Sequence, residues 1–130
     1  FSFVDFSSYV SATFYVIKTE KLNQKYMVAL LNSKLIAFWL KYKGKMQGNN
    51  YQIDKEPIID LPLIKPSDTE QKPFIEIVDK MLAITKSSDY LKNSAKKAEV
   101  KEYEKQIDRM VYKLYGLKPE EVKIVESSAR

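Results

Sequence analysis

Apolar residues recur at helical spacing through the second half of the chain, and this periodicity restricts its fold more than any other feature. They mostly follow one another three or four residues apart, and Lys and Glu fill the positions between them. The pattern predicts two amphipathic helices, interrupted near residues 86–90. Helices joined by so short a connection bury their apolar faces against each other as an antiparallel hairpin. The two apolar stripes are formed by Phe74, Ile77, Met81 and Ile84 and by Leu91, Ala95, Ala98, Tyr103, Ile107, Met110 and Leu114.

Short local signals predict where these helices begin and end. Ser67, or the aspartate after it, is placed to cap the first helix, with Glu70 in the first turn. Gly116 follows the second stripe, and Pro119 stands at an early position of one further short helix. We therefore expect residues 68–130 to form a helical arm of two long antiparallel helices and a short terminal helix.

The first half of the chain mixes strand and helix signals. Residues 13–19, Thr-Phe-Tyr-Val-Ile-Lys-Thr, are rich in β-branched and aromatic side chains, which predicts a buried strand. Apolar residues then repeat at helical spacing over 27–42, and Gly44 follows where a C-terminal cap is expected. Tyr51 begins an extended segment, and three prolines between it and Ser67 prevent a central strand there.

Together these elements predict the α+β class. We expect a small mixed α/β head over residues 1–67, followed by the helical arm over 68–130. The 130 residues suffice for one domain with a modest core. Because the chain begins with Phe1 rather than Met, we expect it to be a piece of a longer protein.

Positive charge is concentrated in the first part of the chain. Residues 1–67 carry nine lysines and five acids, whereas residues 68–130 carry thirteen basic and twelve acidic residues. No acid occurs between Lys21 and Ile53, although six lysines do. We expect such a segment to present one positive face to a polyanion such as DNA. The alternative is a solvated helix flank that keeps the domain soluble.

The composition excludes most kinds of catalytic site. The chain has no Cys and no His, which removes zinc fingers, thiol nucleophiles and Ser-His triads, and its three glycines could hardly supply a phosphate loop. Asp108 with Glu121 and Lys123 matches a metal-dependent nuclease by letters only, because these residues fall outside adjacent strands. No apolar run approaches the roughly 20 residues of a membrane span. We expect no catalysis, cofactor, metal or membrane contact in this piece.

Three stretches together resemble a known family. Residues 26–64 contain an Ala-Leu-Leu-Asn-Ser-Lys run, a polar Gly-containing loop, a Tyr-x-Ile step and a Leu-Pro-Leu-Ile exit. This order resembles the TaqI-like C-terminal specificity domain, the target-recognition part of fused restriction-modification enzymes of the type IIG kind. Residues 70–82 and 107–126 are similar to the helix and the C-terminal ending found in these domains and in type I specificity subunits. The resemblance covers roughly residues 14–126.

The resemblance implies a function in sequence-specific DNA recognition within a cytoplasmic enzyme. The parent protein would carry an adenine-specific methyltransferase domain upstream, with a nuclease domain before that. S-adenosylmethionine, and Mg²⁺ for a nuclease, would bind in those domains. This piece would be the C-terminal part of the recognition domain, gripping double-stranded DNA around an adenine that the methyltransferase flips out.

The loop over residues 40–54 supplies side chains suited to such a contact. Lysines reach phosphates, and the amides of Asn and Gln pair with the edge of adenine in the major groove. Asn49 and Asn50 are equally well explained by turn chemistry. Packing in the core explains Tyr42 and Tyr51 better than contact with DNA does. The residues expected to contact DNA are Lys41, Lys43, Lys45, Gln47, Asn49 and Asn50, with Lys18 and Lys21 as further phosphate contacts.

A second function stays open on the sequence alone. The helical hairpin could serve as a protein-interaction or dimerisation module, with the basic head incidental. Its apolar stripes are wide, and Met81 and Met110 suit adaptable contacts. Self-association through the helical arm is compatible with DNA recognition by the head.

Overall fold

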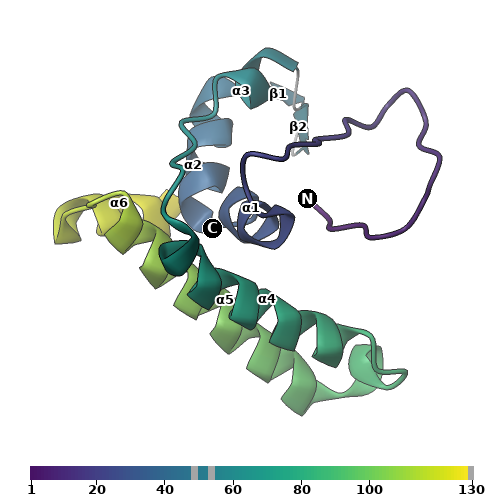
Figure 1. Ribbon diagram of the computed structural model, residues 1–130. Helices are drawn as coiled ribbons and strands as arrows, with labels where there is room; N and C mark the ends of the chain where they lie inside the picture. The colour runs from purple at the N-terminus through teal and green to yellow at the C-terminus, as the bar shows by residue number, and fades with distance from the viewer. Residues whose placement is uncertain (48–49, 53–54, 129–130) are drawn as a thin grey trace.

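The computed structural model describes residues 1–47, 50–52 and 55–128, and helices dominate it (Figure 1). The expected α+β class is wrong, because the β structure of the described residues is a hairpin of two three-residue strands. The chain is therefore all-α in class. In chain order the elements are α1 (Gln24–Leu31), α2 (Lys34–Lys43), β1 (Lys45–Gln47), β2 (Asn50–Gln52), α3 (Lys55–Ile59), α4 (Asp68–Thr85), the 3-10 helix η1 (Tyr90–Lys92), α5 (Ser94–Leu114) and α6 (Pro119–Ser128).

The strand predicted over residues 13–19 is absent. The whole segment before α1 has neither helix nor strand, and it forms the open loop drawn in purple and dark blue in Figure 1. Phe14 and Val16 leave 68% and 71% of their surface exposed. A strand needs a partner for its backbone groups, and no described strand pairs with this segment. Its β-branched composition was therefore not sufficient to form one.

The helix predicted over residues 27–42 is divided into α1 and α2 by a bend at Asn32 and Ser33. Ser33 adopts extended backbone, with φ −68° and ψ 154°, and its hydroxyl accepts a hydrogen bond from the Ile36 backbone N–H at 3.4 Å. The same hydroxyl donates to the Leu30 carbonyl at 2.7 Å. Ser33 thus ends one helix and caps the next. Apolar spacing alone does not reveal such a cap.

The expected end of α2 is confirmed, whereas the segment after the hairpin differs from the prediction. Gly44 is the C-cap, and its N–H donates to the Leu40 carbonyl. Residues 55–59, predicted as extended, instead form the short helix α3, and residues 61–67 after it have neither helix nor strand. Pro57 fits there, because the N–H groups of the first turn have no partner within a helix.

The ends of α4 and α5 follow the local signals. Ser67 and Glu70 form a complete capping box at the start of α4, and Gly116 has a positive φ of 66° just beyond α5. α4 and α5 lie side by side, with η1 at the turn between them (Figure 1).

One hydrophobic core joins the two halves of the chain. α1 packs on α4, where the fully buried Tyr26 ring meets Phe74 edge-on, with centroids 5.3 Å apart and an interplanar angle of 82°. The Tyr26 hydroxyl donates to the Ile64 carbonyl at 2.9 Å, which ties the segment before α4 to α1. The other main core residues are Leu30, Ile36, Leu40, Ile77, Val78, Ile107 and Val111.

Candidate nucleic-acid interface

The predicted DNA-contact residues cluster where α2 ends and the hairpin begins. Lys41 and Lys43 lie in the last turn of α2, and Gly44 is the single residue between this helix and β1. β1 and β2 pair antiparallel, with Lys45 opposite Gln52 and Gln47 opposite Asn50. We call this stretch, residues 41–52, the hairpin tip. Five of the eight predicted residues lie in its described parts, 41–47 and 50–52.

The lysines of the last turn of α2 differ in their surroundings. The Lys41 ammonium group donates to the Ser128 carbonyl of α6 at 3.0 Å, so this side chain lies along the molecule. Lys43 is exposed. Lys45, Gln47 and Asn50 are described through their strand pairing.

The remaining predicted contacts lie elsewhere. Asn49 falls outside the described residues. Lys18 and Lys21 are both exposed in the segment before α1, a different element from the hairpin tip. The backbone N–H of Lys21 donates to the Thr19 hydroxyl at 3.1 Å, a local turn contact.

Tyr42 is not a core residue, contrary to the interpretation from its spacing. It leaves 66% of its surface exposed, and its ring packs against Phe38, at 4.7 Å between centroids. An exposed tyrosine between two lysines adds a ring and a hydroxyl to the hairpin tip. The side chain of Tyr51 lies outside the described residues.

The expectation that all six lysines of the acid-free run form one positive face does not hold. The Lys25 ammonium group pairs with Asp79 of α4 at 2.5 Å, and that of Lys34 pairs with Glu126 of α6 at 2.5 Å. Carboxylates from distant parts of the sequence therefore neutralise these two lysines. Of the other lysines in the run, Lys21 and Lys43 are exposed.

The junction formed by Asn32, Ser33 and Lys34 was not predicted from the sequence. The Asn32 side chain accepts from the Phe1 amino group at 2.8 Å and donates to the Phe1 carbonyl at 2.9 Å, so it binds backbone on both sides of that residue. The Lys34 backbone N–H donates to the Asp108 carboxylate of α5 at 2.8 Å. The Asn-Ser pair within the apolar stripe was the available signal, because both residues favour helix ends.

The pKa values of Asp108 and Glu126, which both lie beside Lys34, are shifted in opposite directions. Burial raises the pKa of Asp108, against the lowering effect of the Lys34 backbone N–H and ammonium group. The hydrogen bond from Lys34 holds the pKa of Glu126 below its usual range. Glu126 also accepts from the Tyr112 hydroxyl at 2.8 Å, and burial, reinforced by that carboxylate, raises the pKa of Tyr112.

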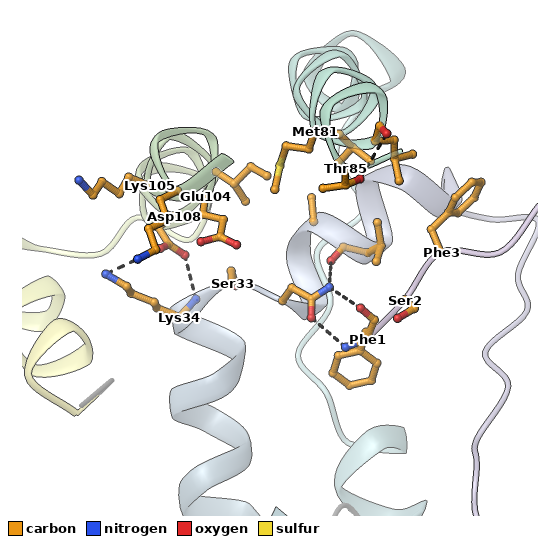
Figure 2. A pocket seen from close by; sticks show the side chains of 17 residues that line it. Phe1, Ser2, Phe3, Ser33, Lys34, Met81, Thr85, Glu104, Lys105 and Asp108 are labelled. Atoms are coloured by element: carbon orange, nitrogen blue, oxygen red, sulfur yellow. Dashed lines mark hydrogen bonds and ion pairs between the residues drawn. The ribbon is translucent and has the colours of Figure 1, made fainter. Parts of the chain in front are cut away.

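A pocket of about 700 Å³ opens beside this junction, between the N-terminal residues, α1, α4 and α5. Figure 2 shows Phe1 and Phe3 on one side of it and Lys34 and Asp108 on the other. Its walls are mainly apolar. In residues 1–47, 50–52 and 55–128, no cluster of three or more acidic residues is placed to hold a metal ion. Over the same residues, no helix has the length and apolar character to cross a membrane.

Comparison with known proteins connects this geometry to a family. Residues 1–63 match the TaqI-like C-terminal specificity domain. The resemblance stated from the sequence is confirmed for this part of the chain, which includes the Asn32–Lys34 junction and the hairpin tip. The specificity-domain match ends before α4.

Two curated relatives share a shorter segment. A 38-residue stretch is 40% identical to the type II methyltransferase M.HincII of Haemophilus influenzae and, equally, to the type II methyltransferase M.HindII of Haemophilus influenzae strain Rd. Each alignment covers 29% of this chain, 8% of M.HincII and 7% of M.HindII. The aligned segment thus spans less than a tenth of either relative. No solved structure matches the chain.

Proposed function

We propose that this chain is the DNA-recognition part of a restriction-modification enzyme, and that its hairpin tip faces the target sequence. One observation carries the proposal. Within a segment matching a specificity domain, α2 ends in lysines and passes through a single glycine into a two-stranded hairpin rich in amide side chains. A two-stranded β-ribbon is narrow enough to enter the major groove of B-DNA.

The residues of the hairpin tip take different parts in this contact. Lys43 and Lys45 neutralise phosphates on either side of the groove, which sets position and most of the affinity. Lys41 joins them once its ammonium group leaves the Ser128 carbonyl. Gln47, Asn49 and Asn50 offer paired donors and acceptors to adenine edges, and Tyr42 packs beside the backbone. Lys18 and Lys21 add charge from the N-terminal segment.

The chemistry belongs to other parts of the proposed parent protein. An adenine-specific methyltransferase domain, using S-adenosylmethionine, precedes this chain and flips the target base while the hairpin tip holds the flanking sequence. The methyltransferase relatives support this part of the proposal. A nuclease domain using Mg²⁺ would complete a type IIG enzyme. This chain contributes recognition and no reacting group.

The first testable prediction is salt-dependent DNA binding by the 130-residue chain. The test variant replaces Lys41, Lys43 and Lys45 with Glu at the same time. Fluorescence anisotropy with a labelled duplex is expected to show binding by the unchanged protein that weakens as salt rises. The triple variant is expected to lose binding, because each phosphate contact contributes about one unit to the slope of log K against log salt.

A second triple variant separates local contact from total charge. Lys86, Lys92 and Lys97 are exposed around η1, at the end of the α4–α5 pair remote from α2 (Figure 1). Changing these three to Glu alters the net charge equally and is expected to leave most of the affinity. Equal losses in the two triple variants would contradict the assignment of the hairpin tip. Absence of binding by the unchanged protein at low salt would contradict the proposed function itself.

A further inference from the structure

Asp108 is a buried carboxylate aimed at the first residue of α2. Its side chain lies on α5, the residue is 6% exposed, and one oxygen accepts from the Lys34 backbone N–H at 2.8 Å. The other oxygen lies 3.9 Å from the Lys34 ammonium group. Figure 2 shows Asp108 above Lys34, with both interactions drawn. Burying a carboxylate is costly, and this environment does raise its pKa. A carboxylate kept here therefore needs a compensating contact.

The contact that compensates is made to backbone rather than to a side chain. The first N–H groups of a helix have no partner within the helix. In α2, the Ser33 hydroxyl accepts from Ile36, and Asp108 accepts from Lys34. A negative charge at this end also interacts favourably with the helix dipole. Because the donor is a backbone N–H, this bond links the start of α2 itself, rather than the long Lys34 side chain, to α5.

The far end of α2 carries the hairpin tip. A helix of this length, Lys34–Lys43, extends about 15 Å, so a tilt of about 10° at its start moves its other end by roughly 2.6 Å. Hydrogen-bond distances to bases tolerate only a few tenths of an ångström. The direction of α2 therefore decides whether side chains beyond Gly44 reach a base edge.

We propose that Asp108 is a positioning residue that aims the hairpin tip, by holding the Lys34 backbone N–H against α5. As a statement about DNA recognition this rests on the proposed function, but the geometric part stands without it. The Lys34 side chain is secondary here, because its pairing with Glu126 lies at a partly exposed site where ion pairs contribute little.

A proline at position 34 removes the backbone donor together with the Lys34 side chain. Lys34 is the first residue of α2, where proline is well tolerated, and the extended backbone of Ser33 suits a residue preceding proline. Lys34→Pro therefore deletes the N–H that Asp108 accepts. Lys34→Ala is the matched control, because it removes the same side chain and keeps that N–H.

Spin labels report the direction of α2 directly. The chain has no cysteine, so Ala37→Cys on α2 and Ala98→Cys on α5, both exposed, give two unique labelling sites. The distance distribution between the labels is expected to stay narrow in Lys34→Ala and to shift or broaden in Lys34→Pro. Identical distributions in the two variants would overturn the positioning role.

Asp108 itself gives an independent test through rescue. Asp108→Asn keeps an oxygen that accepts from Lys34 and is expected to retain the narrow distribution, whereas Asp108→Ala is expected to lose it. If Asp108→Ala fails to fold, Lys34→Pro still decides the question. A narrow distribution in both folded Asp108 variants would contradict the proposal.

DNA binding separates this inference from the proposed function. Lys34→Pro is expected to bind the duplex about tenfold more weakly than Lys34→Ala, equivalent to losing one hydrogen bond to a charged group. Equal affinities with different label distances would overturn the aiming of the hairpin tip. If the unchanged protein ignores DNA, the proposed function fails, and the label distances still report whether Asp108 fixes α2.

Discussion

Two carboxylates lie beside Lys34, which favours the ionised form of both, yet their pKa values shift in opposite directions. Asp108 is buried, while Glu126 is partly exposed and accepts from both the Lys34 ammonium group and the Tyr112 hydroxyl. Burial is the largest influence on the pKa of Asp108, and the hydrogen bond from Lys34 is the largest influence on the pKa of Glu126. The ionised form of Asp108 therefore costs stability, whereas that of Glu126 contributes it.

The pH dependence of these two groups follows from their opposite shifts. The folded pKa of Asp108 is raised, so its contribution to the free energy of unfolding is complete below its ordinary pKa and is lost as pH rises through the folded value. The folded pKa of Glu126 is lowered, so its contribution is present above its ordinary pKa and is lost as pH falls.

We expect carboxyl carbon NMR to show Asp108 titrating above 3.8 and Glu126 below 4.5, their ordinary values. Lys34→Met is the control, and it should raise both midpoints because the ammonium group favours both ionised forms. An Asp108 midpoint below its ordinary value would show that burial is not the dominant influence.

The Tyr26 hydroxyl offers a second residue-scale prediction. Tyr26→Phe keeps the ring against Phe74 and removes the donor to the Ile64 carbonyl. We expect a loss of about 1 kcal/mol in the free energy of unfolding, measured by urea denaturation. Tyr115→Phe removes a similar bond to Pro62 at an exposed site, where water can replace it, and should cost less. Equal losses would contradict the role of burial.

At the scale of elements, Gly116 ends α5 in a way that few residues allow. Its φ is 66°, and a Cβ at this position would meet no atom within 4 Å. The strain of a substitution is therefore confined to the backbone. We expect Gly116→Ala to lower the free energy of unfolding by about 1 kcal/mol, and Gly116→Asn to lower it less, because Asn tolerates this conformation. Thermal unfolding measures both variants. A larger loss in Gly116→Asn than in Gly116→Ala would show that side-chain packing, rather than backbone strain, matters at this position.

Element boundaries could be predicted where one residue determines them. Ser67 with Glu70, and Gly116, satisfy backbone groups of their own helix, so the sequence carries the whole signal. The strand expected at 13–19 depended instead on a partner strand, which composition cannot supply. The division of the long apolar stripe depended on Ser33, a polar residue that apolar spacing ignores.

The candidate site was predictable to a similar degree. The apolar spacing and Gly44 placed Lys43 correctly in the last turn of a helix, whereas the hairpin after it was expected as a polar loop. Position along the chain could not show that Lys25 and Lys34 meet carboxylates more than fifty residues away, because such pairs arise from tertiary packing. Tyr42 was misjudged because its spacing matches the apolar stripe while its side chain points outward.

At the scale of the whole molecule, the core crosses the expected boundary at residue 67. Tyr26 packs on Phe74, and Asn23 donates its backbone N–H to the buried Gln71 at 3.2 Å. The division into a head and an arm stays a prediction. A shared core nevertheless predicts that the two parts unfold together.

We therefore expect residues 1–67 alone to remain unfolded, since α1 would expose the face it buries against α4. Amide NMR of this piece should show little dispersion, whereas the 130-residue chain should show a fully dispersed spectrum. A dispersed spectrum from 1–67 would establish an independent head.

Sedimentation of the full chain tests the self-association expected through the arm. A dimer that does not bind DNA would favour the interaction module over DNA recognition.

The ladder between β1 and β2 is made of backbone bonds, with Met46 opposite Tyr51 at its centre. Every residue except proline has the backbone N–H and carbonyl that such bonds need. A new set of residues could therefore be transplanted into this short ribbon, while the helices beneath it keep their arrangement. Under the proposed function, exchanging the side chains of this ribbon would change the DNA sequence that the protein recognises.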